Sequence, residues 1–277
     1  MRAMSGFTIE DFKFEYSIDR SELEGRIESP IFVEGLLGVG HVGLLSANHL
    51  LRELEFEKAA EVYSPHFSEP FQPKDTPGVV YSEKGTAKLH YNELFYNPEN
   101  DLFVYKGLYQ GDYCEYYYRH ANLMIGFCND LGVGRVYTLG GLGTGSEVEE
   151  PNTHAIVTSE EQVARIGPHA EIQRGKENRP GVTGLSGLLI GIAEKNGIEG
   201  VSLLGETHGA YPDAKAAKTV LDSLSKIEGI EMGLSALDEK AEELEEKKEE
   251  FKRKMKMIRG RGRGRGGEER GDRRYVG

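Results

Sequence analysis

The sequence has no tryptophan and only two cysteines, Cys114 and Cys128, among its 277 residues. A disulfide scaffold and a four-cysteine zinc site each need more cysteines, so both are excluded. The two thiols lie 14 residues apart in a predicted helix. That spacing is about 21 Å along the helix axis, too far for a bond between them. We expect both thiols to be buried and unreactive.

Long hydrophobic runs are also missing. No stretch reaches 18 consecutive apolar residues, so no membrane-spanning helix and no membrane partner are predicted. The first residues lack the apolar centre of a secretory signal, which favours a cytoplasmic protein. The eight histidines form neither H-x-x-x-H nor H-E-x-x-H, so we expect no local metal site.

Charge is plentiful but unevenly distributed. The net charge is −12, yet residues 1–237 hold 35 of the 46 acidic residues and only 20 of the 34 basic ones. Residues 259–277 carry seven basic and three acidic residues. An acidic body repels nucleic acid, so binding of RNA is possible only through these last residues.

Residues 1–234 alternate between predicted strands and predicted helices, which indicates one α/β domain with a mainly parallel sheet and helices on both faces. Short apolar or β-branched runs predict strands at 30–33, 59–64, 79–82, 87–95, 102–106, 136–139, 155–158 and 201–204. Apolar residues at helical spacing predict helices at 42–54, 113–131, 185–195 and 212–227.

Residues 235–258 form a charged amphipathic segment with a heptad pattern. The seam that we expect to mediate oligomerisation consists of Leu237, Leu244, Phe251 and Ile258. Ala241, Lys248 and Met255 occupy the second core position, and Lys248 makes the pattern imperfect. The alternative is a single surface helix.

Residues 259–277 begin with four Arg-Gly repeats and contain no apolar side chain before Tyr275. Such a segment cannot bury enough surface to fold alone, so a flexible tail is predicted.

The hexapeptide Gly38–Gly43 matches G-x-G-x-x-G between a strand and a helix. In a dinucleotide site an acidic residue follows the second strand, but here that strand ends in Ser64-Pro65-His66. The predicted strand before the glycines also ends near Glu34, which leaves an overlong turn. We therefore interpret the glycines as a tight turn with close helix–sheet packing, and expect no cofactor.

A rival hypothesis is an enzyme with a Glu/His site at the rim of the sheet. Glu206 and His208 follow a predicted strand, where sites of α/β proteins gather, and Glu34 and His41 could lie at the same rim. Small-molecule hydrolase or phosphorylase-like chemistry would use these four residues. Because no G-x-S-x-G elbow is present, we favour a polar network that closes the sheet.

Five segments in order resemble the proteasome assembly chaperone type 2 family. The resemblance covers residues 29–234 and rests on residues 32–43, 102–110, 136–141, 181–189, and 203–207 followed by 212–214. It implies an α/β/α sandwich in a homo-oligomeric, non-enzymatic chaperone of archaeal type that acts on 20S proteasome α subunits. Members that bind the proteasome directly end in hydrophobic-Tyr-X, which implies partner docking through Tyr275, Val276 and Gly277. The tyrosine here is third from the end, after Arg274.

Overall fold

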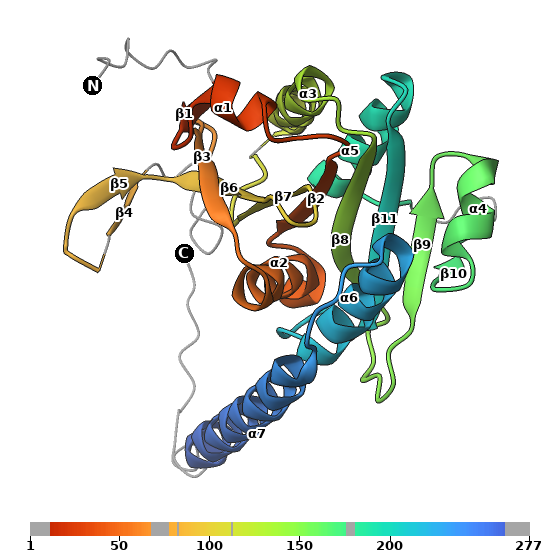
Figure 1. Cartoon of the computed structure of the whole chain (residues 1–277). Coiled ribbons are helices and arrows are strands. Elements are labelled where there is room, and N and C mark those ends of the chain that lie inside the picture. Colours follow the sequence, from red (N-terminus) through yellow and green to blue (C-terminus); the bar gives the residue numbers. More distant parts are fainter. Residues whose placement is uncertain (1–11, 68–77, 82, 112, 176–180, 264–277) are drawn as a thin grey trace, which may run out of the picture.

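The computed structural model describes residues 12–67, 78–81, 83–111, 113–175 and 181–263. Within them, nine strands form one sheet in the order β1-β3-β6-β7-β2-β8-β11-β9-β10, and β4 and β5 form a separate hairpin (Figure 1). The strands of the sheet are β1 Lys13–Tyr16, β2 Ile31–Leu36, β3 Glu57–Tyr63, β6 Tyr91–Asn97, β7 Leu102–Gly107, β8 Arg135–Gly143, β9 Thr153–Val157, β10 Glu171–Ile172 and β11 Glu199–Thr207. The hairpin consists of β4 Val79–Tyr81 and β5 Ala87–Leu89.

Helices cover both faces of the sheet, and their order along the chain gives the α/β alternation that the sequence predicts (Figure 1). They are α1 Arg20–Glu24, α2 Val42–Glu53, α3 Cys114–Asp130, α4 Glu160–Ile166, α5 Gly184–Lys195, α6 Ala214–Glu228 and α7 Ser235–Arg263, with a 3₁₀ turn, η1, at Val39–His41. The predicted fold class, an α/β sandwich of three layers, is confirmed. The last helix extends five residues beyond the predicted end at Ile258.

The centre of the sheet is parallel and its flanks are mixed. Strands β7, β2, β8 and β11 run parallel. On one side β1, β3 and β6 pair antiparallel with their neighbours, and on the other β9 pairs antiparallel with β11 and parallel with β10. Every residue of β2 is buried. Strands covered on both faces need apolar side chains in both directions, which is why the central strands read as continuous apolar runs.

Two hydrophobic cores lie on opposite faces of this sheet. On one face, α3 and α5 pack over Phe32, Phe103 and Tyr105. On the other, α2 and α6 pack over Val33 and Val104. Alternate residues of one strand therefore supply different cores, as the two-residue period of a strand requires.

Several predicted boundaries are wrong. The predicted strand 87–95 is two strands, β5 and β6, with the buried His90 between them. Strand β2 continues to Leu36, so the turn that follows it is shorter than expected. The short elements β1, α1, α4 and β10 were not predicted at all. Cys128 is buried as expected, but Cys114 is exposed because it lies in the first turn of α3.

Close packing explains the glycines around η1, as predicted. A Cβ at Gly35 would lie 2.6 Å from that of Ala47 on α2, and one at Gly43 would overlap the carbonyl oxygen of Leu139 on β8. Gly40 has a φ of +60°, which favours glycine, and it faces Thr207. These glycines let α2 approach the sheet backbone directly.

We predict that Gly43→Ala lowers the free energy of unfolding by about 2 kcal/mol or more, because the added methyl overlaps backbone that cannot move aside. Gly191→Ala in α5 is the matched control: nothing lies within 4 Å of its added Cβ. That change should be neutral or stabilise by up to about 1 kcal/mol. Urea unfolding of both variants measures the difference, and equal stabilities would contradict the packing argument.

Candidate functional site

A hollow of 880 Å³ lies at the carboxyl ends of the central strands. The strand order changes direction at β2, whose neighbours β7 and β8 both come later in the chain, and ligand sites of open α/β sheets lie at such points. The hollow is lined by the ends of β2 and β8, the start of α3 and the start of α5. Its described lining includes Gly38, Val39, Gln110, Cys114, Tyr117, Tyr118, Leu139, Gly140, Gly141, Thr183, Gly184 and Ser186.

Glu34 is a buried carboxyl group behind the lining residue Ser186 of this hollow, and only 1% of its surface is exposed. One carboxyl oxygen accepts a hydrogen bond of 2.9 Å from the amide of Leu36, and the other accepts one of 2.8 Å from the hydroxyl of Ser186 on α5. Burial raises the pKa of Glu34 to about 7, and these two hydrogen bonds oppose that rise only in part. Glu34 therefore ties α5 to the centre of the sheet.

Gln110 joins three elements at the edge of the same hollow. Its side-chain amide donates to the carbonyl of Leu37 at 2.7 Å, and its side-chain oxygen accepts from the amide of Leu185 at 3.2 Å. The backbone carbonyl of Gln110 lies 2.9 Å from Nδ1 of His120. The Nε2 atom of His120 lies 2.7 Å from the hydroxyl of Tyr105. Burial lowers the pKa of His120 to about 4, so this ring is neutral at pH 7. These hydrogen bonds hold the walls of the hollow in place. The polar groups that form them are paired with each other.

The four residues of the enzyme hypothesis do not form one site. Glu206 accepts hydrogen bonds from Asn152, and its carboxylate lies 3.0 Å from Nε2 of His154. His208 lies beside Tyr211, at a different cavity. None of Glu34, His41, Glu206 and His208 is among the described residues that line the hollow. Glu34 and Glu206 instead belong to separate polar contacts, one with Ser186 and the other with Asn152 and His154.

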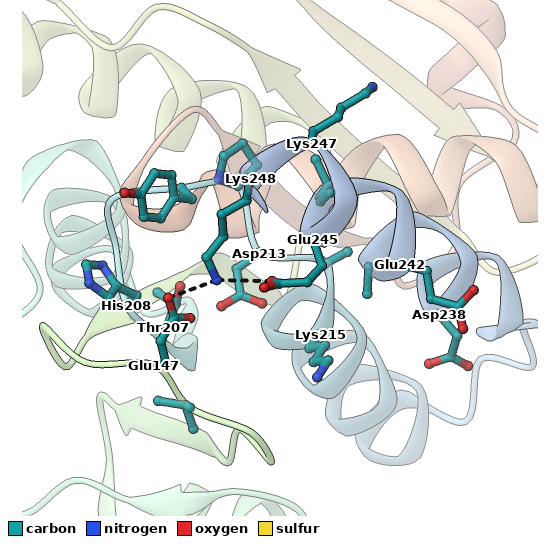
Figure 2. Close-up of a pocket in the computed structure, with 16 residues that line it drawn as sticks. Glu147, Thr207, His208, Asp213, Lys215, Asp238, Glu242, Glu245, Lys247 and Lys248 are labelled. Carbon is teal, nitrogen blue, oxygen red and sulfur yellow. Dashed lines mark hydrogen bonds and ion pairs between the residues drawn. The ribbon is translucent and has the colours of Figure 1, made fainter. Parts of the chain in front are cut away.

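A second cavity, of 670 Å³, lies between the body and α7. Figure 2 shows its lining, which comes from the loop after β8, the loop between β11 and α6, and the inner side of α7. Lys248 of α7 reaches across it (Figure 2). Its ammonium group lies 2.8 Å from the carboxylate of Glu147 and 3.0 Å from that of Glu245, and it also sits 5.8 Å from the ring centre of Tyr211. Only 12% of the Lys248 side chain is exposed, so the lysine at the imperfect heptad position contacts the body of its own chain.

The first half of the predicted oligomerisation seam also contacts the body of its own chain. Leu237 is 3% exposed in the core beneath α6, and Leu244 packs partly against the same core. The backbone of Phe251 and Ile258 continues α7, but their side chains lie outside the described part. The docking residues Tyr275, Val276 and Gly277 and most of the Arg-Gly tail also lie outside the described residues.

The described residues contain no group of three or more His, Cys, Asp or Glu side chains placed to hold a metal ion. No helix in the described part of the chain is both long and apolar enough to cross a membrane. Sequence reasoning missed two features: the pairing of Lys248 with Glu147, which lie far apart in sequence, and the role of Ser186, a single hydroxyl with no local signal.

Comparisons with known proteins converge on one family. The family model described as the PAC2 family matches residues 32–252. An uncharacterized protein of Methanocaldococcus jannaschii is 32% identical over 253 residues, which cover 91% of this chain and 93% of that protein.

Two solved structures are similar over nearly their whole length. Pyrococcus furiosus PbaB, described as an archaeal proteasome activator, is 32% identical with a TM-score of 0.76, and the match covers 88% of this chain and 99% of that one. Pyrococcus furiosus PbaA, described as an archaeal homolog of proteasome-assembly chaperone, is 25% identical with a TM-score of 0.68, over 86% of this chain and 93% of that one.

The raised pKa of Glu34 predicts a specific pH dependence. A folded-state pKa of about 7 against an ordinary value of 4.5 means that folded Glu34 holds its proton more tightly than unfolded Glu34. The contribution of Glu34 to the free energy of unfolding is therefore complete below pH 4.5. It is lost as the pH rises to about 7, and the free energy of unfolding falls by about 3 kcal/mol over this range.

Glu34→Gln should remove this fall, so that the variant gains stability relative to the wild type between pH 4.5 and 7. Urea unfolding at several pH values measures the difference. Glu206→Gln is the control, because the pKa of Glu206 is lowered by its hydrogen bond with His154. Parallel pH profiles for Glu34→Gln and the wild type would contradict the prediction.

Proposed function

This chain belongs to the PAC2 family, and we propose that it is a homo-oligomeric, non-enzymatic assembly chaperone that binds 20S proteasome α subunits. The observation that carries the proposal is the likeness to the two Pyrococcus proteins over almost the whole of each chain. Both are described by their connection with the proteasome, one as an activator and the other as a homolog of an assembly chaperone. Similarity to these proteins over the whole body supports a shared function more strongly than a single shared motif would.

The polar groups near the hollow support a non-enzymatic role. Glu34, Gln110 and His120 pair with groups of their own chain, and they connect β2 with α3 and α5. A general base or acid must instead reach a substrate proton. In this chain the Glu, Gln and His side chains instead fix the positions of the helices that form the surface around the hollow. A surface of fixed shape is what binding to a complementary protein surface requires.

Docking on the proteasome would use Tyr275 and Val276. Between Ile258 and Tyr275 the sequence contains no apolar side chain, so these two residues alone can bury appreciable apolar area at that end. The Arg-Gly repeats carry positive charge toward an acidic partner surface. Self-association would use the outer part of α7, at Phe251 and Ile258, since Leu237 and Leu244 contact the body.

A second candidate function is activation of the assembled proteasome. The description of PbaB as an activator favours it, because PbaB shares 32% identity with this chain. The two functions differ in the form of the partner that is bound. An assembly chaperone acts on free α subunits, whereas an activator raises hydrolysis by complete 20S particles.

We predict that the full chain binds α subunits and that deletion of Tyr275–Gly277 weakens binding at least about tenfold, since burial of a tyrosine and a valine contributes more than 1.4 kcal/mol. Changing Arg261, Arg263 and Arg265 to lysine is the control and should have little effect, because the charge is kept. Surface plasmon resonance with immobilised α subunits measures both.

Two further readouts separate the candidates. Faster formation of α-subunit rings supports the chaperone function, and faster peptide hydrolysis by complete 20S particles supports activation. Absence of binding to both α subunits and 20S particles would overturn the proposal.

A further inference from the structure

The hollow at the carboxyl ends of β2 and β8 is lined by side chains without charge. Its apolar residues come from η1, β8, α5 and β11, and they include Val39, Leu139, Leu142, Leu188 and Leu204. Tyr117 and Tyr118 of α3 add two aromatic rings, and none of the described lining residues is acidic or basic. Val39 is 48% exposed and Tyr118 is 50% exposed, so apolar surface at the rim faces solvent. This lining suits an apolar or aromatic occupant and disfavours a charged one.

The same chain contains an occupant of this chemistry. Tyr275 and Val276 are the only apolar side chains of residues 259–277, and they are adjacent. A tyrosine ring buries a large apolar area, and its hydroxyl needs a hydrogen-bond partner. The hydroxyl of Ser186 lies in the lining and donates its proton to Glu34, so its oxygen can still accept a hydrogen bond. The hollow thus offers both apolar contact and a polar partner to this pair.

We propose that the hollow is a binding site for Tyr275 and Val276 of the same chain. The site itself stands without the proposed function, whereas its consequence rests on that function. Residues held in the hollow are withheld from the proteasome until an α subunit competes for them. The hollow therefore limits how readily the chain docks on its partner.

The chain is long enough for this contact. Although α7 extends past the body (Figure 1), its residue Lys248 contacts the ring of Tyr211. Two residues before Tyr211, a Cβ at Gly209 would lie 3.2 Å from the side chain of Val39 at the rim of the hollow. The helix ends at residue 263, about 22 Å along its axis beyond Lys248. Residues 264–275 span up to about 40 Å when extended, so they can return along α7 to the rim.

Charge along this return path has the required sign. The loop after β8 begins beside Leu142 in the lining of the hollow and runs to the cavity under α7. It carries three exposed acidic residues, Glu147, Glu149 and Glu150. Arg273 and Arg274 directly precede Tyr275, and residues 259–277 carry seven basic against three acidic residues. With Tyr275 in the hollow, the two arginines lie within reach of this acidic loop, and opposite charges favour the contact.

Contact within one chain is favoured over contact with the tail of a second copy. A segment joined to its own site by a short linker has an effective concentration on the order of millimolar. A second copy has no such advantage, and two chains of net charge −12 repel each other. The occupant is therefore the tail of the chain that forms the hollow.

Cys114 makes the contact measurable, because this thiol is exposed and lines the hollow. In the full chain, Gly277→Cys places a second thiol two residues beyond Tyr275. A short bifunctional thiol crosslinker should join positions 114 and 277 within one chain, as identified by mass spectrometry of the linked peptides. The matched control combines Gly277→Cys with Cys114→Ser and Ser146→Cys. Ser146 is exposed on the acidic loop and is not among the described residues that line the hollow.

Crosslinking to position 114 should be at least about tenfold faster than crosslinking to position 146, because binding concentrates the tail at the hollow. Adding Tyr275→Ala, or adding Val39→Asp at the rim, should remove this difference. Far-UV circular dichroism checks that each variant is folded. Equal rates at the two positions, or a rate at position 114 that neither variant lowers, would overturn the proposal. Crosslinked dimers in place of crosslinked monomers would identify a second copy as the occupant and also overturn it.

Binding to α subunits tests the consequence separately. Val39→Asp should bind immobilised α subunits at least about threefold more tightly than the wild type, because its tail is no longer withheld. Unchanged or weaker binding would contradict the competition between the hollow and the proteasome. If no variant binds α subunits, the proposed function fails, while the crosslinking result still decides whether the hollow holds the tail.

Discussion

Direct backbone contact between α2 and the carboxyl ends of β2 and β8 determines the rest of this structure. Side chains at Gly35 and Gly43 would occupy space taken by Ala47 and by the carbonyl of Leu139, so only glycine permits the contact. The same approach brings η1 against β8, where a Cβ at Gly141 would overlap the carbonyl of Val39. A helix held this close fixes the loop that forms one wall of the hollow.

The opposite wall depends on polar contacts instead of close backbone packing. Gln110 joins the end of β2 to α5, and Glu34 anchors Ser186 from below. A buried carboxyl group is unfavourable unless it is hydrogen-bonded or neutral, and Glu34 is both hydrogen-bonded and shifted toward the neutral form. The hollow thus sits where α/β enzymes place their sites, yet the polar groups nearby are used to hold the helices on the sheet.

Sequence patterns identified the parts of the fold whose burial is strongest. The central strands and α3 were predicted because their apolar residues repeat at regular intervals, and the glycines of η1 were interpreted correctly from the missing ribose acid. The short elements β1, α1, α4 and β10 gave no such signal, since only Leu23 of α1 is fully buried and β10 has two residues. The break between β5 and β6 was missed because the buried His90 is hydrogen-bonded to the backbone carbonyl of Phe67, 23 residues away in sequence, and no local pattern reveals that contact.

The segment 235–258 shows why a heptad pattern alone does not decide what a helix contacts. A lysine at a core position is unfavourable in a two-stranded coiled coil, but it is well accommodated against Glu147 and the ring of Tyr211. Both partners come from loops that follow strands of the body, so no local pattern could reveal them. Since Leu237, Leu244 and Lys248 all contact the body, the first half of α7 is committed within the protomer. The apolar seam that the heptad pattern predicts is therefore used, over this half of the helix, for contact within one chain.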